Sequence, residues 1–215
     1  FERREPANPA YGWIVGAAVA KGTIRWIDTD EARAAPGVLA VVTARDAGPL
    51  GKGDRNTVRL LGGPRIDHYH QAIAVVVAET LEQARAAAAL VRVDYDRAAG
   101  SFDLDEALKA APATDDDGKR ARADRVGSFE TAFAAAPVQL DAEYSTPDHT
   151  HAMMEPFASI AQWNGDELEL WTSNQMIDWG RSELARTLNL PKEKIRFHSP
   201  YIGGGFGGKL FLRAD

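Results

Sequence analysis

Short apolar runs, separated by glycine and charged residues, dominate the first part of the chain. The runs at 12–20, 23–27 and 38–43 have the length and continuity of strands. Lys21-Gly22 separates the first two runs, so the pattern predicts two strands joined by a tight turn. These elements indicate a small sheet-containing domain at the start of the chain.

Residues 71–95 form the clearest local unit of this first half. Gln71–Ala78 predicts a buried strand, and Val91–Tyr95 predicts an alternating one. Between them, residues 80–90 predict a helix, because Thr80 is followed three residues later by Gln83, which is the signature of a capping box. Alanine dominates this helix, so it can lie close to a sheet. The pattern predicts a βαβ-like unit of a small α/β domain.

The character of the chain changes after about residue 97. Gly100, Pro112 and the acidic run Asp115–Asp117 interrupt the apolar pattern, so this stretch cannot bury much apolar surface. We expect a connection between domains, with short helices near Asp103–Ala110 and Phe129–Ala135.

Beyond Pro137 the pattern is again that of strands. Apolar and polar residues alternate from Val138 to Tyr144, which is the period of a half-buried strand. Asn164-Gly165 separates two further apolar runs and predicts a hairpin with a type I′ turn. The remaining predicted elements are a helix at 176–188 with Asn174 as N-cap, its stop at Pro191, and a strand at Ile195–Ser199.

Composition excludes several classes of protein. The chain has 215 residues, with 25 basic and 31 acidic side chains and a formal net charge of −6, and this acidic excess gives no electrostatic footprint for a nucleic-acid backbone. It contains no cysteine, which excludes disulfides, cysteine-ligated zinc or iron–sulfur centres and a thiol nucleophile within these residues. The longest apolar run is too short to span a membrane. Because the chain begins with Phe1, we expect a piece of a longer polypeptide.

The most informative stretch is the glycine run at 203–208, in which five glycines surround Phe206. Glycine permits positive φ angles and lets backbone amides approach a ligand closely, which favours a cradle for an anion or a cofactor. The string also matches a P-loop up to Lys209, but Leu210 stands where magnesium binding requires Ser or Thr. The alternative is a flexible turn without a ligand.

Several motifs resemble the molybdenum-cofactor subunit of the xanthine dehydrogenase and aldehyde oxidase family, and among its members the large subunit of bacterial periplasmic aldehyde oxidoreductases. The resemblance covers nearly the whole chain, and its motifs agree in order. They are Leu60–Pro64, His68–Gln71, the unit at 71–95, Met154-Glu155-Pro156, Trp171–Trp179, Asn189-Leu190-Pro191, Ser199–Ile202 and Gly203–Lys209.

The resemblance implies an α+β protein. An α/β hammerhead domain at 1–97 would be followed by a linker at 98–136. Residues 137–215 would then be the first, incomplete part of a molybdopterin-binding α+β domain.

The resemblance also implies a set of site residues. Gln175 would hydrogen-bond the apical ligand of molybdenum, and the alternative is that it caps the following helix. The backbone amides of Gly204, Gly205, Phe206, Gly207 and Gly208 would contact the cofactor. No side chain would ligate the metal directly. Glu155 belongs to a family motif near the active site, with a loop-stabilising carboxylate as the alternative.

The reaction implied by the resemblance is the oxidation of aldehydes to carboxylic acids with oxygen taken from water. Purine-oxidising relatives carry a glutamate at the position of Leu210, and an apolar side chain there cannot bind a polar heterocycle, so an aldehyde, including an aromatic one, suits the site better. The family's general-base glutamate would lie beyond Asp215, so no catalytic residue is expected within these residues.

The implied cofactor is molybdopterin with molybdenum, including its cytosine dinucleotide form. Because the chain has no cysteine, the [2Fe–2S] centres and FAD would belong to an iron–sulfur subunit and a FAD subunit of the same complex. The resemblance implies a periplasmic complex exported with a signal-bearing partner, and the alternative is the cytoplasm. The alternative functions are a non-catalytic assembly module, a hydroxylase of N-heterocycles and, from the P-loop string, a nucleotide binder.

Overall fold

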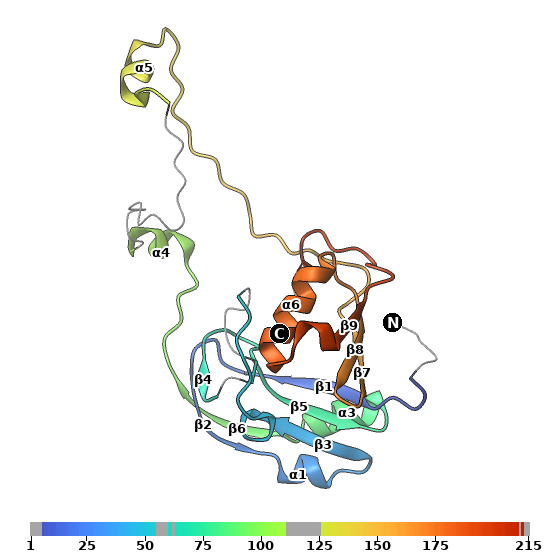
Figure 1. The fold of residues 1–215 in the computed structure, drawn as a ribbon. Helices are drawn as coiled ribbons and strands as arrows, with labels where there is room; N and C mark the ends of the chain where they lie inside the picture. Colours follow the sequence, from blue (N-terminus) through green and yellow to red (C-terminus); the bar gives the residue numbers. More distant parts are fainter. Residues whose placement is uncertain (1–5, 55–59, 62, 111–125, 211, 213–215) are drawn as a thin grey trace. The chain divides into compact units, whose positions relative to one another are not determined.

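The computed structural model describes residues 6–54, 60–61, 63–110, 126–210 and 212. They belong to two compact units, one made of residues 1–100 and 151–215 and the other of residues 101–150. Figure 1 shows helices and three-stranded sheets in the first unit. This mixture confirms the predicted α+β class.

The first sheet has the order β1-β5-β3, and both pairs are antiparallel. Helix α3 packs on β1 and β5, and α1 packs on β3. Val41, Val76 and Ala87 are fully buried where the helices meet the sheet. The elements are β1 (Tyr11–Gly16), α1 (Asp30–Ala34), β3 (Val38–Thr43), β5 (Ala72–Ala78) and α3 (Leu81–Ala88).

The second sheet has the order β4-β2-β6, again antiparallel. Its strands are β2 (Gly22–Asp28), β4 (Arg65–Ile66) and β6 (Arg92–Arg97). The predicted pairing of the first two strands is wrong, because β1 joins one sheet and β2 the other. Apolar residues of both sheets, among them Ile66 and Ile73, form a shared core instead.

Helix α3 begins as the sequence predicts. The Thr80 hydroxyl accepts a hydrogen bond from the Gln83 N–H at 3.2 Å, and the Gln83 carboxamide accepts one from the Thr80 N–H at 3.0 Å. The capping box is therefore confirmed. The βαβ-like interpretation is wrong, because the strands on either side of α3 lie in different sheets.

A second capping box holds the short helix α2 (Ala44–Ala47). The Asp46 carboxylate accepts hydrogen bonds from the Thr43 hydroxyl at 2.7 Å and the Thr43 N–H at 2.8 Å, and Arg33 donates to it at 3.1 Å. These contacts lower the pKa of Asp46 below its ordinary value of 3.8, with the Thr43 hydroxyl as the largest cause. A carboxyl with a lowered pKa stabilises the fold above its ordinary pKa, and this contribution is lost as the pH falls through the folded-state pKa.

We therefore expect Asp46→Asn to lower the thermal midpoint at neutral pH, because the amide cannot carry the stabilised charge. The difference from the wild type should shrink as the pH falls below about 4. Thermal unfolding of the two proteins, followed from neutral pH downward, measures this. Thr43→Val, which removes the main donor, should weaken the same acid dependence. A difference that widens on acidification would contradict the assignment.

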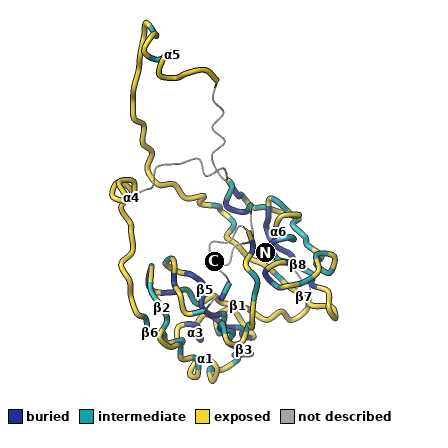
Figure 2. The backbone as a smooth tube through the Cα atoms, turned by 60° about the vertical axis from the view of Figure 1, so that its left-hand side comes forward, coloured by how far each residue is buried: buried dark blue, intermediate teal, exposed yellow. Residues whose placement is uncertain are grey.

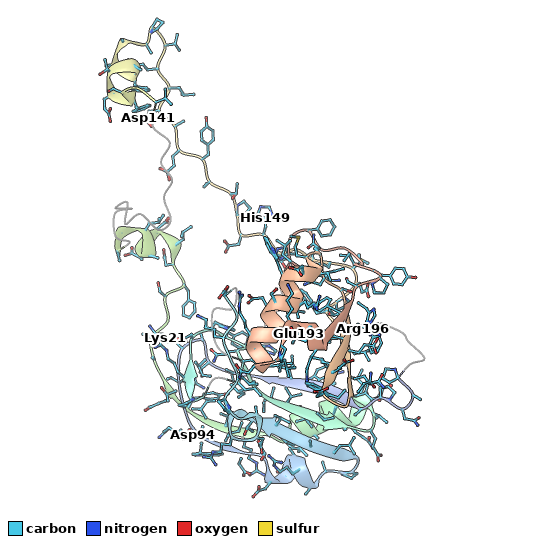
Figure 3. All side chains as sticks on the ribbon, in the orientation of Figure 1. Lys21, Asp94, Asp141, His149, Glu193 and Arg196 are labelled. Carbon is cyan, nitrogen blue, oxygen red and sulfur yellow. The ribbon has the colours of Figure 1, made fainter. Side chains whose placement is uncertain are left out.

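The unit at 101–150 contains the two predicted short helices, α4 (Leu104–Ala110) and α5 (Phe129–Ala135). Residues 111–125 of the predicted linker lie outside the described residues. The strand predicted at Val138–Tyr144 is wrong. These residues have no regular hydrogen bonding and are exposed, as the tube beyond α5 in Figure 2 shows, and Asp141 and His149 lie along this trace in Figure 3. Alternation alone makes no strand, because a strand also needs a neighbour to bond with.

The last part of the first unit is a sheet of order β7-β8-β9. Its elements are β7 (Ser159–Asn164), β8 (Glu167–Thr172), α6 (Ile177–Leu188), the 3₁₀ helix η1 (Lys192–Lys194) and β9 (Ile195–His198). Strands β7 and β8 form the predicted hairpin, whereas β9 runs parallel to β8 after the crossover through α6.

Two local predictions about this sheet are wrong. The hairpin turn has Gly165 and Asp166 at its centre, and only Gly165, at φ 64°, has a positive φ, whereas type I′ requires two. The N-cap of α6 is Met176 and not Asn174. The Asn174 side chain nevertheless accepts a hydrogen bond from the N–H of Met176, the N-cap residue, at 2.9 Å.

Candidate functional site

The parallel pair β8 and β9 brings two distant loops together. Parallel strands end at the same edge of a sheet, so the loop after β8 and the glycine run after β9 lie beside each other. The Ser199 hydroxyl accepts a hydrogen bond from the Asn174 N–H at 2.9 Å and donates one to the Asn174 carbonyl at 3.0 Å. Gln175, the next residue, is thereby held against the glycine run. Ligands of open sheets commonly bind outside this edge.

The glycine run contains a tight turn. The Gly208 N–H donates to the Gly205 carbonyl at 2.7 Å, and the two central residues, Phe206 and Gly207, have φ angles of 48° and 91°. Two positive φ values are typical of a type I′ turn. Phe206, at the tip of the turn, is 76% exposed. Among the described residues, no acceptor bonds the amides of 204–207, so these donors remain available to a ligand.

Gln175 is oriented by the residue that follows the turn. Its N–H donates to the Lys209 carbonyl at 2.7 Å, and its Oε1 accepts from the Lys209 N–H at 3.3 Å. Only the oxygen of a carboxamide can accept such a bond, so the amide nitrogen is directed elsewhere. Within the described ranges this nitrogen has no partner, and it can donate to a bound oxygen atom.

The glycines are needed because side chains fill the space around them. A Cβ at Gly205 would lie 2.5 Å from Gln175 Oε1, and one at Gly203 would collide with the Glu155 carboxylate. At Gly208 it would lie 2.9 Å from the His151 ring. The run is therefore enclosed by Gln175 on one side and by residues 151–155 on the other.

A cavity of about 470 Å³ adjoins the turn. Gly208, His151, Met153, Ser159 and Ser173 are among the residues that line it. The Ser173 hydroxyl is buried and has no hydrogen-bond partner in the part of the chain that the structure describes. A buried polar atom without a partner is costly, which indicates that this edge of the sheet is completed by a further polar group.

The structure thus brings together Gln175, Gly204, Gly205, Phe206, Gly207 and Gly208, as the motifs require. Leu210, two residues after Gly208, is half-buried, and its place in a substrate pocket stays a prediction. The described residues contain no group of three or more His, Asp or Glu side chains that could hold a metal ion.

Sequence reasoning missed the role of Lys209. Its side chain is completely buried, and its ammonium donates to the carbonyls of Glu155 and Ile202 at 2.9 and 2.6 Å. A P-loop lysine must instead reach the phosphates of its nucleotide. The nucleotide-binding interpretation is therefore contradicted by the contacts of this lysine as well as by Leu210.

Two family profiles match the chain in tandem. Residues 3–99 match the a/b hammerhead domain of aldehyde oxidase and xanthine dehydrogenase, and residues 114–214 match the molybdopterin cofactor-binding domain. The chain belongs to the xanthine dehydrogenase and aldehyde oxidase family. These matches confirm the predicted resemblance and the hammerhead fold. The members of this family carry molybdenum.

Individual members of the family are similar over nearly the whole chain. The aldehyde oxidoreductase molybdenum-binding subunit PaoC of Escherichia coli K12 is 60% identical over 98% of this chain, which corresponds to 28% of PaoC. A Cu,Mo-containing CO dehydrogenase has a TM-score of 0.76 at 28% identity, covering 99% of this chain and 30% of that one. Quinoline 2-oxidoreductase of Pseudomonas putida 86, with a TM-score of 0.78 at 24% identity over 97% of this chain and 28% of its own, shares the fold.

The chain therefore spans just over a quarter of the length of PaoC. Of its described helices, none combines the length and the apolar character that crossing a membrane requires. The residues present fit the family's cofactor. The backbone amides and the Ser173 hydroxyl, which bond no other described residue, and the oriented carboxamide of Gln175 are neutral polar groups suited to an anionic ligand.

Proposed function

We propose that this chain is part of the molybdenum-binding large subunit of an aldehyde oxidoreductase, which oxidises aldehydes, aromatic ones included, to carboxylic acids with oxygen from water. The 60% identity to PaoC across 98% of the chain carries the proposal. The convergence of Gln175 with the turn at Gly205–Gly208 supports it, because the residues expected to face the cofactor meet at one edge of a sheet.

Gln175 and the amides of Gly204, Gly205, Phe206 and Gly207 would hold the cofactor, whereas the predicted contact from the Gly208 amide does not fit, because this N–H already bonds the Gly205 carbonyl within the turn. When bound, molybdopterin with molybdenum supplies the two-electron oxidation and the transfer of oxygen from water. The chain's own contribution is to orient the hydrogen-bond donors that face the bound group. The Lys209 N–H holds Gln175 Oε1, so that the amide nitrogen can donate to an oxygen atom of the bound group. The turn keeps its free N–H groups in a fixed geometry, which avoids reorganisation when negative charge is bound.

Leu210 would contribute to substrate choice. Its half-buried apolar side chain offers no hydrogen bond or charge to a purine, whereas an aldehyde with an apolar body loses nothing by contact with it. The general base of the reaction would be a glutamate of the parent subunit outside these residues.

Electron transfer would require partner subunits. The chain has no cysteine, so [2Fe–2S] centres would reside in an iron–sulfur subunit and a FAD subunit would accept the electrons. We further propose that the pterin carries the cytosine dinucleotide and that the three-subunit complex works in the periplasm, exported with a signal-bearing partner. Cell fractionation of the native host tests the compartment.

The decisive experiment uses the full-length subunit purified from its own host with its companions. We expect molybdenum and a pterin in the preparation, oxidation of benzaldehyde to benzoate, and ¹⁸O in the product when the reaction runs in H₂¹⁸O. Absence of molybdenum and pterin would overturn the proposal in favour of a non-catalytic module. Activity on nicotinate or xanthine with none on aldehydes would overturn the substrate assignment alone.

A further inference from the structure

Lys209 carries a buried positive charge that no carboxylate in the described part of the chain neutralises. Its side chain has no exposed surface, and its ammonium is bonded to two main-chain carbonyls, with the Phe157 ring centre 5.7 Å away. No carboxylate of the described residues lies within ion-pair distance of it. Buried lysines are ordinarily paired with an acid, because an unpaired charge is expensive to remove from water. The two carbonyls and the aromatic face stabilise the ammonium, but none of them carries a formal negative charge.

The same residue joins three segments of the site. Its ammonium bonds the carbonyl of Glu155 and the carbonyl of Ile202, the residue just before the glycine run. Its main chain bonds Gln175 twice, once through the backbone and once through the carboxamide. The Glu155 N–H also donates to the Gly203 carbonyl at 3.3 Å, so the Glu155 segment and the glycine run are bonded directly as well.

We infer that Lys209 is a positioning residue of the cofactor site: its ammonium locks the glycine run onto the Glu155 segment, its main chain holds Gln175, and its unneutralised charge favours an anionic cofactor in the cradle. The inference rests on the proposed function. Molybdopterin carries a phosphate and a dithiolene, so it is the kind of anion that such a charge attracts. If Lys209 had only an architectural role, replacing it would change the stability of the protein and not its cofactor content.

Lys209→Met tests both parts, because methionine keeps the apolar stem and removes the donors and the charge. In the full-length subunit, expressed with its companions, we expect the molybdenum and pterin contents per polypeptide to fall roughly tenfold or more, the range found for residues that orient metal sites. In the fraction that remains loaded, the Mo(V) electron paramagnetic resonance signal should shift, because the Glu155 segment and the start of the glycine run are no longer held together by the ammonium.

Three variants serve as comparisons. Lys21→Met removes an exposed lysine and should retain full molybdenum content. Ile66→Ala weakens the buried hammerhead core and separates a general loss of stability from a loss of cofactor. Lys209→Gln keeps a donor without the charge, and it provides a second measurement if Lys209→Met does not fold.

The outcomes are separable. Wild-type protein without molybdenum would overturn the proposed function itself. Wild-type protein with molybdenum, together with a Lys209→Met protein of equal molybdenum content and identical resonance signal, would overturn only the inference. Loss of all soluble protein in both Lys209 variants would also overturn it, because Lys209 would then be a residue of the fold and not of the cofactor site.

Discussion

Alanine at position 205 is expected to remove most of the molybdenum from the full-length subunit while leaving the fold intact. The added Cβ would lie 2.5 Å from Oε1 and 2.7 Å from Cδ of Gln175, closer than atoms tolerate. The obstructing atoms are the end of a flexible side chain, so the collision is relieved cheaply when Gln175 rotates away. That rotation breaks the Lys209 N–H bond to Gln175 and removes the carboxamide from the site. A loss of roughly ten- to hundredfold in molybdenum affinity is the expected scale.

Molybdenum and pterin contents of purified Gly205→Ala protein measure this effect, and circular dichroism confirms that the fold survives. Gly12→Ala is the matched control. Like Gly205, Gly12 has no positive φ, but a Cβ there would meet Val75 at an ordinary contact distance of 3.6 Å. This control should retain molybdenum. If Gly205→Ala is as fully loaded as the control, Gln175 has no part in holding the cofactor.

Local chemistry could be predicted from the sequence, and strand pairing could not. The capping box of Thr80 and Gln83 is written in residues three apart, and the structure contains it. The partner of β1 is β5, about sixty residues further along the chain, and no local pattern contains that information. The predicted tight turn at Lys21-Gly22 therefore suggested that the first two strands pair, whereas they lie in different sheets.

The candidate site was predictable as far as its motifs reach. The resemblance implied that Gln175 and the glycines around Phe206 serve one cofactor site, and the hydrogen bonds around Lys209 connect their segments. The buried state of Lys209 was not predictable, because lysine is among the residues most often exposed. A lysine directly after five glycines is a signal, but it is shared with nucleotide-binding loops. Only the structure identifies the two carbonyls that occupy its ammonium.

The segment Val138–Tyr144 illustrates a different limit. Its alternation is that of a strand, and its apolar side chains are exposed. The side-chain pattern indicates which face of a strand would be apolar and which polar, whereas backbone hydrogen bonding to a neighbour decides whether the strand forms. Nothing in the described residues pairs with it, so the pattern is present without the structure.

The largest loss of stability is expected at Ile66. This side chain is only 1% exposed and lies in the core that the two hammerhead sheets share. Its strand, β4, is two residues long and pairs with β2 alone among the described strands, so it has few ladder hydrogen bonds and depends strongly on the packing of Ile66. Ile66→Ala is expected to cost about 2–5 kcal/mol, through lost burial and the cavity left behind.

Hydrogen exchange on the full-length subunit measures this cost locally, which avoids assuming that a large protein unfolds in one step. Amides of β2 and β4 should exchange roughly thirtyfold faster or more, because each 1.4 kcal/mol of lost stability is a factor of about ten. Ile177→Ala makes the same truncation on an exposed surface of α6 and should leave exchange in these strands unchanged. Equal exchange in the two variants would mean that β4 is not part of the cooperative core. Unchanged molybdenum content in Ile66→Ala would show at the same time that the hammerhead core and the glycine turn contribute separately, one to stability and the other to cofactor binding.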